Sequence, residues 1–374
     1  MSNNYREREQ ISVAIAGLGF GESVHLPALF ANKGLFLPPS LWHPRSDRLK
    51  EACKANNLEG YERWEELLSD PAIKGVIIAT PPAPRFQMAK EALLAGKHLL
   101  LEKPVSLFTH EIAELQRIAL QSNLIVAVDF EYRAVPLFMQ AKRLLDEGAI
   151  GNPWFIKLDW LMGSRSNPSR PWNWYSSAQE GGGVIGALGT HAFDILHWLF
   201  GPTKQISGLI STSINERVNP KTGKIMTVDS EDVCLAQLNL QTPYGKQDLP
   251  VQLSLSSIAQ RGRGCWLEMY GSEGTLLLGS SNQKDYVHGF NLKASRRGEA
   301  FKDIQPDDDL IFTTTWSDGR IAPVKRIQGW WGESISSGLP VVPGLSEAYA
   351  SQLACEALKE SAKSGLQLAI DTFA

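Results

Sequence analysis

The chain has 374 residues, of which 43% are hydrophobic and 21% charged. This balance excludes wholesale disorder, and at roughly 150 residues per domain the length predicts two or three domains, with two favoured. The 37 Lys and Arg residues against 40 Asp and Glu residues give a net charge of −3, which leaves no basic surplus to attract nucleic acid or an anionic membrane.

Cysteine usage and the start of the chain indicate the compartment. The four cysteines are far apart, at Cys53, Cys234, Cys265 and Cys355. None belongs to a C-x-x-C pair, so we expect buried thiols in a reducing compartment and no metal site. Residues 1–10 lack the apolar core of a signal peptide, and no apolar run reaches the ~20 residues of a membrane span. The sequence therefore predicts a cytoplasmic protein.

The first third of the chain alternates apolar strands with helices. Strands are predicted at 12–16, 35–43, 73–79, 97–101 and 124–129, and helices at 22–32, 47–55, 85–95 and 109–121. This alternation predicts a parallel sheet covered by helices on both faces and built from right-handed βαβ units. We place this doubly wound domain at residues 1–130.

Beyond about residue 150 the pattern changes to longer strands of half-alternating polarity. Examples are 154–162, 205–214, 232–240 and 252–258. Successive strands without intervening helices predict an open, mainly antiparallel sheet. One long helix, 183–200, interrupts the series, and another, 345–364, closes the chain. The second domain, 131–374, is thus expected to be α+β, with its last helix near the domain junction.

A glycine-rich turn, Gly17-Leu18-Gly19-Phe20-Gly21, follows the first strand and opens the first helix. In that context glycines let backbone N–H groups approach a pyrophosphate, and the helix N-terminus adds partial positive charge. The turn departs from G-x-G-x-x-G because Glu22 stands at the last glycine position. We predict a Rossmann dinucleotide site at Gly17, Gly19, Phe20 and Gly21; the alternative is a purely structural turn.

The end of the second strand bears on the choice of cofactor. An Asp or Glu there hydrogen-bonds the 2′-hydroxyl of NAD, whereas this chain has Trp42-His43-Pro44-Arg45-Ser46 and no carboxylate before Asp47. His43, Arg45 and Ser46 suit a 2′-phosphate. NADP(H) is therefore favoured, with NAD(H) as the alternative, unless these residues form a loop that does not contact the cofactor.

Four further motifs occur along the chain. They are Val24-His25-Leu26-Pro27, Ala79-Thr80-Pro81-Pro82, Ala95-Gly96-Lys97-His98 followed by Glu102-Lys103-Pro104, and Gly181-Gly182-Gly183 with Gly189-Thr190-His191-Ala192-Phe193-Asp194. With the tail 346–365 they resemble, over nearly the whole chain, the Gfo/Idh/MocA family of NAD(P)-dependent oxidoreductases (glucose–fructose oxidoreductase, inositol dehydrogenase and relatives). E-K-P after a buried strand and an A-G-K-H turn is the most specific of these motifs.

The resemblance implies a Rossmann domain followed by a domain with an open antiparallel sheet, and a substrate held between nicotinamide and sheet. It implies that Lys103 contacts the nicotinamide ribose and the substrate hydroxyl, and that His191 hydrogen-bonds the same hydroxyl. It also places four residues at the cofactor: Thr80, Pro81, Arg85 and Glu102. Arg85 stands where relatives often have His.

Hydride transfer from a carbinol carbon releases the hydroxyl proton, so a base near that oxygen lowers the barrier. Lys103, at the tip of an apolar strand, is the candidate proton donor and acceptor, and His191 is the second candidate catalytic residue. The alternatives are a surface lysine and a core histidine. Many relatives carry Asp four residues before the histidine, where this chain has Ala187. That departure leaves a Lys–His pair and weakens the case for ordinary polyol dehydrogenation.

Candidate substrate contacts flank the glycine run. Trp172 and Trp174 suit stacking on a ring, and Arg170 suits a carboxylate or hydroxyls. The alternative is an aromatic loop that covers the sheet. Arg133, just after the last parallel strand, and Asp194, one turn after His191, are expected to line the same cleft.

The leading hypothesis is an NAD(P)-dependent dehydrogenase or reductase acting on CH–OH groups of a sugar, cyclitol or related carbonyl compound. A second hypothesis keeps the cofactor but gives it a flatter, apolar substrate of tetrapyrrole or dihydrodiol type, which a Trp-rich cleft without a carboxylate at position 187 would accept. A third is a non-catalytic NAD(P)-binding sensor or regulator. The uncovered sheet face predicts a homodimer or homotetramer through that face.

Overall fold

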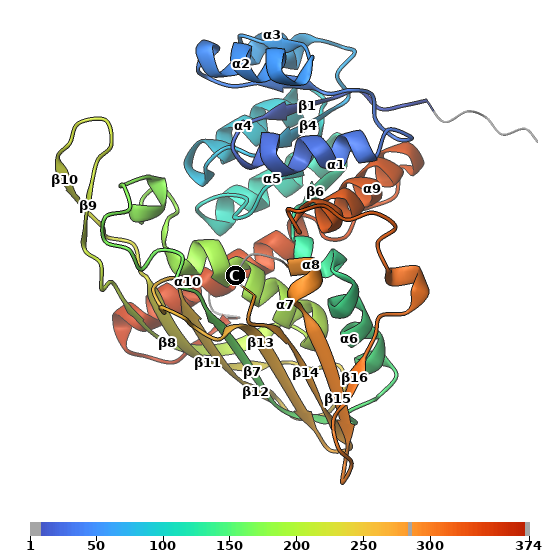
Figure 1. Cartoon of the computed structure of the whole chain (residues 1–374), viewed down its shortest axis with the longest axis vertical. Coiled ribbons are helices and arrows are strands. Elements are labelled where there is room, and N and C mark those ends of the chain that lie inside the picture. The colour runs from blue at the N-terminus through green and yellow to red at the C-terminus, as the bar shows by residue number, and fades with distance from the viewer. Residues whose placement is uncertain (1–8, 283–285, 371–374) are drawn as a thin grey trace, which may run out of the picture.

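The computed structural model describes residues 9–282 and 286–370. These residues form two large sheets, one in the first third of the chain and one after residue 150, with helices around and between them (Figure 1). The expected architecture is confirmed: a doubly wound parallel sheet is followed by an α+β part with an open, mainly antiparallel sheet.

The first sheet has six parallel strands in the order β3-β2-β1-β4-β5-β6, the strand order of a Rossmann dinucleotide-binding fold. The strands are β1 (Val13–Ala16), β2 (Ser40–Trp42), β3 (Gly60–Tyr61), β4 (Gly75–Ile78), β5 (His98–Leu101) and β6 (Val126–Val128). The helices are η1 (Gly21–His25), α1 (Leu26–Ala31), α2 (Ser46–Asn56), α3 (Trp64–Ser69), α4 (Pro82–Leu94) and α5 (Thr109–Gln121). Every residue of β1 and β4 is buried, as strands covered on both faces require.

The predicted extent of one strand in this sheet is wrong. The second strand, expected over 35–43, covers only Ser40–Trp42, because Pro38 and Pro39 have no N–H for the ladder and restrict the backbone before them. The first helix begins one residue early, at Gly21, with five π-helical residues. The short elements β3 and α3 at the edge of the sheet were not predicted.

The second sheet has nine strands in the order β16-β15-β14-β13-β7-β12-β11-β8-β17, antiparallel except for the β7–β12 pair. The strands are β7 (Pro153–Leu161), β8 (Thr203–Ser211), β11 (Val233–Leu240), β12 (Leu249–Ser256), β13 (Gly264–Gly271), β14 (Gly274–Ser280), β15 (Asn291–Arg296), β16 (Lys302–Ile304) and β17 (Leu368–Ala369). A separate hairpin joins β9 (Glu216–Val218) and β10 (Ile225–Thr227).

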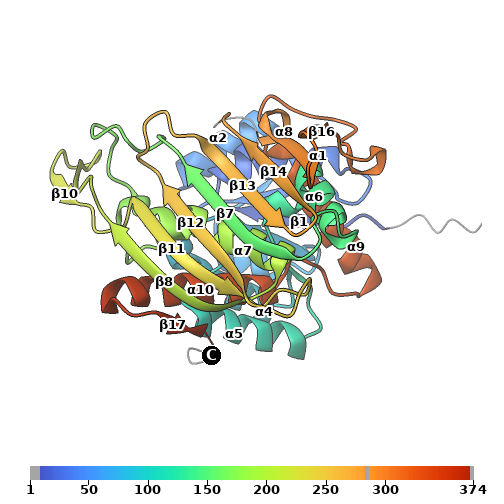
Figure 2. The ribbon, with the colours of Figure 1, turned by 90° about the horizontal axis from the view of Figure 1, so that it is seen from below.

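Helices cover one face of this sheet. The helical segments of this part are η2 (Glu131–Ala134), α6 (Pro136–Asp146), η3 (Trp174–Ser176), η4 (Ile185–Gly189), α7 (Thr190–Phe200), α8 (Tyr286–Gly289), η5 (Asp308–Leu310), α9 (Ile321–Ser337) and α10 (Leu345–Ser364). Helices α7 and α10 pack against each other, and α10 packs on β8. Figure 2 shows the opposite face, on which no described helix lies.

Two helices near the end of the chain connect the two parts. The unpredicted helix α9 returns to the first sheet, where the fully buried Trp331 stacks on Phe36 with ring centroids 5.7 Å apart. The last helix, α10, places Leu345 in the core of the first sheet and Leu358 in the core of the second. The relative position of the two sheets, and of any site between them, therefore depends on these helices.

The four cysteines are free thiols, with Cys53 half-buried and the other three buried. Among the described residues, no helix combines the length and the apolar character that a membrane crossing requires.

Candidate active site

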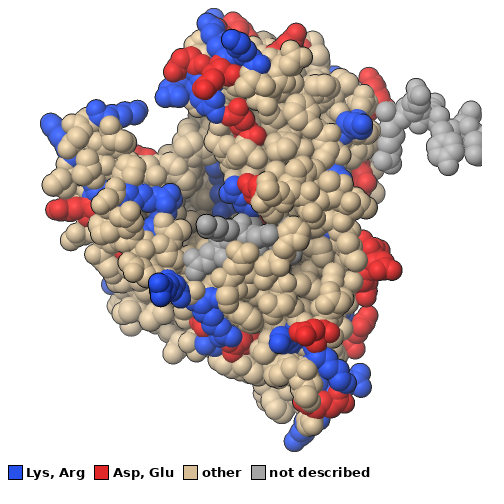
Figure 3. Space-filling model, viewed as in Figure 1, with Lys and Arg blue, Asp and Glu red and all other residues tan. Residues whose placement is uncertain are grey.

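A cavity of about 910 Å³ lies where the carboxyl ends of the parallel strands face the second sheet. Its wall includes the glycine turn, the end of β2, the loops after β4 and β5, the ends of β7 and β12, and the segments η2, η3 and η4. Figure 3 shows this hollow, with Lys and Arg atoms in its wall. The carboxyl edge of a doubly wound sheet is where such folds bind their ligands.

The glycine turn forms one end of the cavity through Gly17, Gly19 and Phe20. Gly17 has a φ of +98°, and a Cβ there would lie 2.7 Å from the Ala79 carbonyl oxygen, so only glycine fits. A Cβ on Gly19 would meet nothing within 4 Å, which leaves its backbone open to a ligand. Gly21 lies outside the lining, because it packs on Ile15, where a Cβ would come within 2.8 Å of the side chain.

The carboxylate of Glu22, which breaks the glycine pattern, is turned to the protein. It forms an ion pair with Arg48 and accepts a hydrogen bond of 3.2 Å from Asn56 Nδ2. A negative group at this position therefore does not face the glycine turn. The cradle fits the pyrophosphate of a dinucleotide.

Beyond the turn, the cavity extends along Trp42, His43 and Pro44. Arg45 and Ser46 lie outside the lining. The Arg45 side chain is 65% exposed and 3.8 Å from Asp47, and the Ser46 hydroxyl donates to Glu62 over 3.3 Å.

Arg85 shapes the wall between the glycine turn and Lys103. Its guanidinium is 3% exposed and donates to the carbonyl oxygens of Thr80, Glu102 and Pro104. Burial lowers the pKa of Arg85 to about 10, so it stays charged at neutral pH. Thr80 and Pro81 line the cavity beside it, and the buried Thr80 hydroxyl has no hydrogen-bond partner among the described residues. This orphaned hydroxyl suits a ribose.

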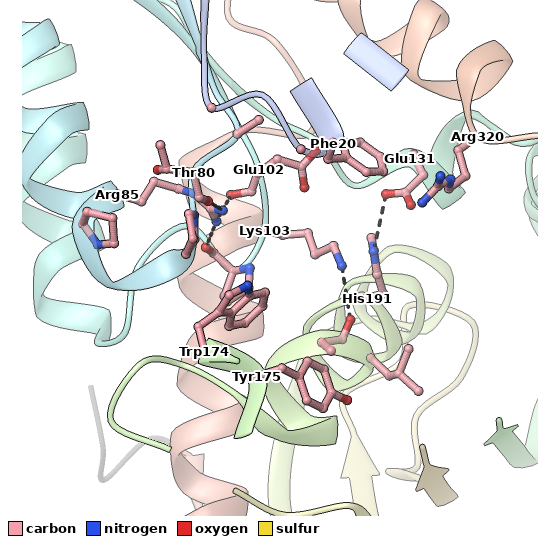
Figure 4. A pocket seen from close by; sticks show the side chains of 18 of the residues that line it. Phe20, Thr80, Arg85, Glu102, Lys103, Glu131, Trp174, Tyr175, His191 and Arg320 are labelled. Carbon is pink, nitrogen blue, oxygen red and sulfur yellow. Dashed lines mark hydrogen bonds and ion pairs between the residues drawn. The ribbon is translucent and has the colours of Figure 1, made fainter. Parts of the chain in front are cut away.

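Lys103 and His191 meet across the cavity, one from each part of the chain (Figure 4). The Lys103 ammonium donates to the Ala187 carbonyl oxygen over 3.2 Å. The His191 ring lies against Tyr132, with ring centroids 4.9 Å apart. Burial first, and the charge of Lys103 second, lower the pKa of His191 well below its ordinary value, so the imidazole is neutral.

A carboxyl group that the sequence did not single out completes this cluster. Glu131, the first residue of η2, lines the cavity and places Oε2 3.4 Å from His191 Nε2. Burial raises the pKa of Glu131 to about 7, although Lys103 opposes the shift. Its position directly after the last parallel strand was the available signal, because such strand ends gather site residues.

Behind Lys103 lies a buried set of three side chains, His25, Glu102 and Asp129, whose ligand-type atoms lie within 4.8 Å of one another. His25 Nε2 is 2.9 Å from Glu102 and 3.6 Å from Asp129. Burial alone would raise the pKa of Glu102, but the hydrogen bond and charge of His25, with Lys103 and Arg85, lower it to about 2. Burial and the charges of Glu102 and Glu131 raise the pKa of Asp129 well above its ordinary value. The pair therefore holds one proton and one negative charge.

Arg133 and Asp194 lie outside the cavity lining and bind each other. Two hydrogen bonds of 2.8 and 2.7 Å join the guanidinium to the carboxylate, and both side chains are buried. Their hydrogen-bonding groups are thus committed within the protein, and the structure does not bring them to the cleft that the sequence suggested.

The aromatic loop is divided between the cavity and the surface. Trp174 lines the cavity, whereas the Trp172 indole donates to the Thr227 carbonyl oxygen and the exposed Arg170 donates to that of Ser164. Two further arginines that the sequence did not single out, Arg165 and Arg320, line the cavity instead. They come from loops whose position relative to the strands the sequence pattern does not indicate.

Two sequence-family models match the chain, one in each of its two parts. The model described as "Oxidoreductase family, NAD-binding Rossmann fold" matches residues 11–130, and that described as "GFO/IDH/MocA C-terminal domain" matches residues 138–277.

Individual relatives are similar over most of their length. An uncharacterised oxidoreductase of Synechocystis is 41% identical over 94% of both chains. The levoglucosan dehydrogenase of Pseudarthrobacter phenanthrenivorans is 25% identical over 95% of this chain and 96% of its own. The NADP(+)-dependent scyllo-inositol 2-dehydrogenase IolW of Bacillus subtilis is 26% identical over 54% of this chain and 55% of its own. A structure of levoglucosan dehydrogenase with NADH and levoglucosan shares the fold, with a TM-score of 0.84, 22% identity and coverage of 96% of this chain and 99% of that one.

Proposed function

We propose that this chain, which belongs to the Gfo/Idh/MocA family of NAD-binding oxidoreductases, acts on a hydroxyl or carbonyl group of a sugar or cyclitol, with Lys103 as the proton donor and acceptor. The observation that carries the proposal is the position of the Lys103 ammonium. It lies in the cavity wall, beside the neutral imidazole of His191 and next to the loops that fit a dinucleotide. A bound nicotinamide would accept or supply the hydride.

The protein's own groups supply the proton chemistry. The ammonium of Lys103 donates to a carbonyl oxygen of the substrate during reduction, and the amine accepts the proton during oxidation. The neutral His191 imidazole is a hydrogen-bonding group for the same oxygen. Sugar and cyclitol substrates are supported by the names of two relatives, levoglucosan dehydrogenase and scyllo-inositol 2-dehydrogenase.

Glu131 adds a proton-exchanging carboxyl to this pair. It contacts His191 at 3.4 Å, and its pKa of about 7 lets it gain or lose a proton at neutral pH. A carboxyl here provides what Ala187 lacks, although it comes from the end of β6 instead of the helix that carries His191. We therefore assign Glu131 the role of exchanging the proton of the Lys103–His191 pair.

We favour NADP(H) as the cofactor. The carboxylates in the described lining of the cavity are Glu102 and Glu131, both beside Lys103, and neither lies at the end of β2. That end offers the ring of His43 and the long exposed side chain of Arg45 to a 2′-phosphate. One relative, IolW, is named for NADP(+), and another, levoglucosan dehydrogenase, has been solved with NADH.

The uncovered sheet face is proposed to hold a second copy of the chain, in a dimer or tetramer. Leu209 on β8 and Leu235 on β11 lie directly opposite each other on this face, with 63% and 46% of their surface exposed. Exposed apolar neighbours of this kind mark association surfaces when they extend across strands.

Replacing Lys103 with Met should remove turnover while leaving cofactor binding intact. We expect kcat to fall about 10²- to 10⁴-fold, since a positioned acid–base group contributes a factor of that size. The measurement is turnover of NADP(+) and NAD(+) with levoglucosan, inositols and sugars, together with NADPH binding followed by fluorescence. Lys54→Met, on exposed helix α2, is the matched control.

Unchanged turnover in Lys103→Met would contradict the assigned role. A wild-type chain that binds NADPH but turns over neither polyols nor flat apolar ketones would instead support the sensor hypothesis.

Replacing Glu131 with Gln should make the stability of the protein less dependent on pH. The wild-type carboxyl binds its proton more tightly when folded, so its folding stability falls as the pH rises from about 4.5 to about 7. Gln resembles the protonated form, and the variant should be more stable than wild type by about 3 kcal/mol at pH 8 and equal to it near pH 4. Urea denaturation at the two pH values measures this difference.

Glu65→Gln, on exposed helix α3, should show no such trend. The pH profile of kcat for Glu131→Gln should also lose an ionisation near 7. If the stability difference does not grow with pH, Glu131 does not hold a proton in the folded protein.

Arg45→Ala should raise the KM for NADPH about tenfold, the effect of losing one charge-assisted hydrogen bond to a phosphate, and leave the KM for NADH unchanged. Arg63→Ala, at an exposed position directly before α3, serves as the control. A lower KM for NADH than for NADPH in the wild-type protein would refute the NADP(H) preference.

Sedimentation velocity should show a dimer or tetramer, and a Leu209→Lys, Leu235→Lys double variant should dissociate it because both charges would be buried at the contact. Leu120→Lys, at a position 78% exposed on α5, should leave the assembly intact. A monomeric wild-type protein at micromolar concentration would sink this proposal.

A further inference from the structure

Arg165 is a cation in the cavity wall without a counter-charge. It lies in the loop that follows β7, and its guanidinium lies over the ring of Tyr175, with Cζ 3.2 Å from the ring centroid. Among the described residues, no carboxylate lies within ion-pair distance of it. Burial lowers the pKa of Arg165 to about 10 against an opposing interaction with Tyr175, and the charges of Arg170 and Arg217 add to the decrease, so Arg165 remains charged at neutral pH.

Arginines elsewhere in and around the cavity have partners inside the protein. Arg133 binds the carboxylate of Asp194, and Arg320 binds that of Asp318 through two hydrogen bonds. Arg217 donates to backbone carbonyl oxygens, including that of Arg165. Burying a charge is unfavourable unless an opposite charge lies beside it. An anion from outside the chain would stabilise Arg165 in this position.

A second polar group, the hydroxyl of Ser257, lies on the same wall. Ser257 follows β12, is 2% exposed and lines the cavity, and its hydroxyl lies beside that of Tyr175. The backbone carbonyl oxygen of Ser257 accepts a hydrogen bond of 2.9 Å from the backbone N–H of Arg165, so the two residues lie side by side. A hydroxyl has one donor and two acceptor positions, so Ser257 can bind a ligand in the cavity while it contacts Tyr175.

This wall belongs to the substrate end of the cavity. Figure 4 shows Phe20 of the glycine turn and Tyr175, over whose ring Arg165 lies, on opposite sides of Lys103. The phosphates of a dinucleotide held by the glycine turn would therefore lie across the cavity from Arg165. An anion bound at Arg165 belongs to the molecule that also reaches Lys103 and His191.

We propose that Arg165 and Ser257 form a carboxylate-binding subsite, and that the substrate is a sugar acid or cyclitol acid instead of a neutral polyol. A guanidinium fork binds the two oxygens of a carboxylate in parallel, and the Ser257 hydroxyl donates a third hydrogen bond. Arg170 and Arg217 donate to backbone carbonyl oxygens, so Arg165 supplies the free guanidinium fork, and one such fork matches the two oxygens of a carboxylate. This inference rests on the proposed function, because it names the substrate class of the same cavity.

The test compares sugars that differ only at C6. Binding of D-glucose, D-galactose and D-mannose, of their C6 acids and of their 6-phosphates is measured by calorimetry on the NADPH-loaded protein. At least one acid should bind at least about tenfold more tightly than its parent sugar, the effect of one charge-assisted hydrogen bond. Arg165→Gln should abolish that preference without changing the affinity for the neutral sugar or for NADPH, and Arg165→Lys should restore part of it.

Arg170→Gln, in the same loop but exposed and bonded to a backbone carbonyl, is the matched control and should keep the preference. Acids that bind no better than sugars, or a preference that survives in Arg165→Gln, would overturn the proposal. So would tighter binding of the 6-phosphates, which would assign the subsite to phosphate. A rise in the Kd for NADPH in Arg165→Gln would also overturn it, because Arg165 would then serve the cofactor.

The two proposals fail in different ways. If Lys103→Met keeps the Arg165-dependent preference for acids and the wild-type protein shows no turnover, only the proposed function is wrong. If sugars are turned over but acids gain nothing from Arg165, only the subsite is wrong.

Discussion

The three hydrogen bonds of the buried Arg85 guanidinium hold together the two loops on which the candidate active site depends. One loop leaves β4 at Thr80 and the other leaves β5 at Glu102, and neither carbonyl oxygen has a place in the sheet ladder beyond the strand end. A guanidinium can satisfy several acceptors at once because its donors form a rigid planar fork, whereas an ammonium is a single point. The direction in which Lys103 leaves the sheet follows from this anchor.

The same region controls how much charge surrounds Lys103. Three carboxyl groups lie near it, yet their environments divide them into different protonation states. Glu102 is ionised because His25 donates to it, Asp129 keeps its proton because it is buried and lies beside the ionised Glu102, and Glu131 lies near its midpoint at neutral pH. Pairs of carboxyls pushed apart in this way typify sites that exchange protons. The neutral His191 adds no positive charge to this cluster, so the ammonium of Lys103 is the cation among these groups.

The sequence predicted the elements whose signal is local. Apolar strands, the glycine turn and the helix at 345–364 match the structure because buried strands and capped helices have short-range patterns. Helix α9 was not predicted, because Pro323 and the glycines at 329 and 332 are unfavourable in helices and interrupt the apolar periodicity of its sequence. The predicted start of the second strand was wrong for a related reason, because Pro38 and Pro39 have no N–H groups to donate to a neighbouring strand.

The site was only half predictable because its decisive contacts join distant segments. Lys103 and His191 were found through motifs, but Glu131 reaches His191 across 60 residues of sequence, and no spacing rule connects them. Glu131 and Tyr132 also sit in a short 3-10 turn, which has no periodic pattern to indicate which side chain faces inward.

Arg133 and Arg165 show why residue type alone does not identify a ligand contact. The sequence pointed to Arg133 and not to Arg165. The side chain of Arg133 is buried and that of Arg165 is half-buried. Asp194 neutralises Arg133 and holds it in a fixed orientation with two hydrogen bonds, so its contribution is to hold η2 against α7. The ring of Tyr175 orients the guanidinium of Arg165 but does not neutralise its charge. Arg165 therefore remains a positively charged hydrogen-bond donor without a carboxylate partner. What separates these two arginines is therefore the counter-charge, which only Arg133 has, and that is a property of the folded chain.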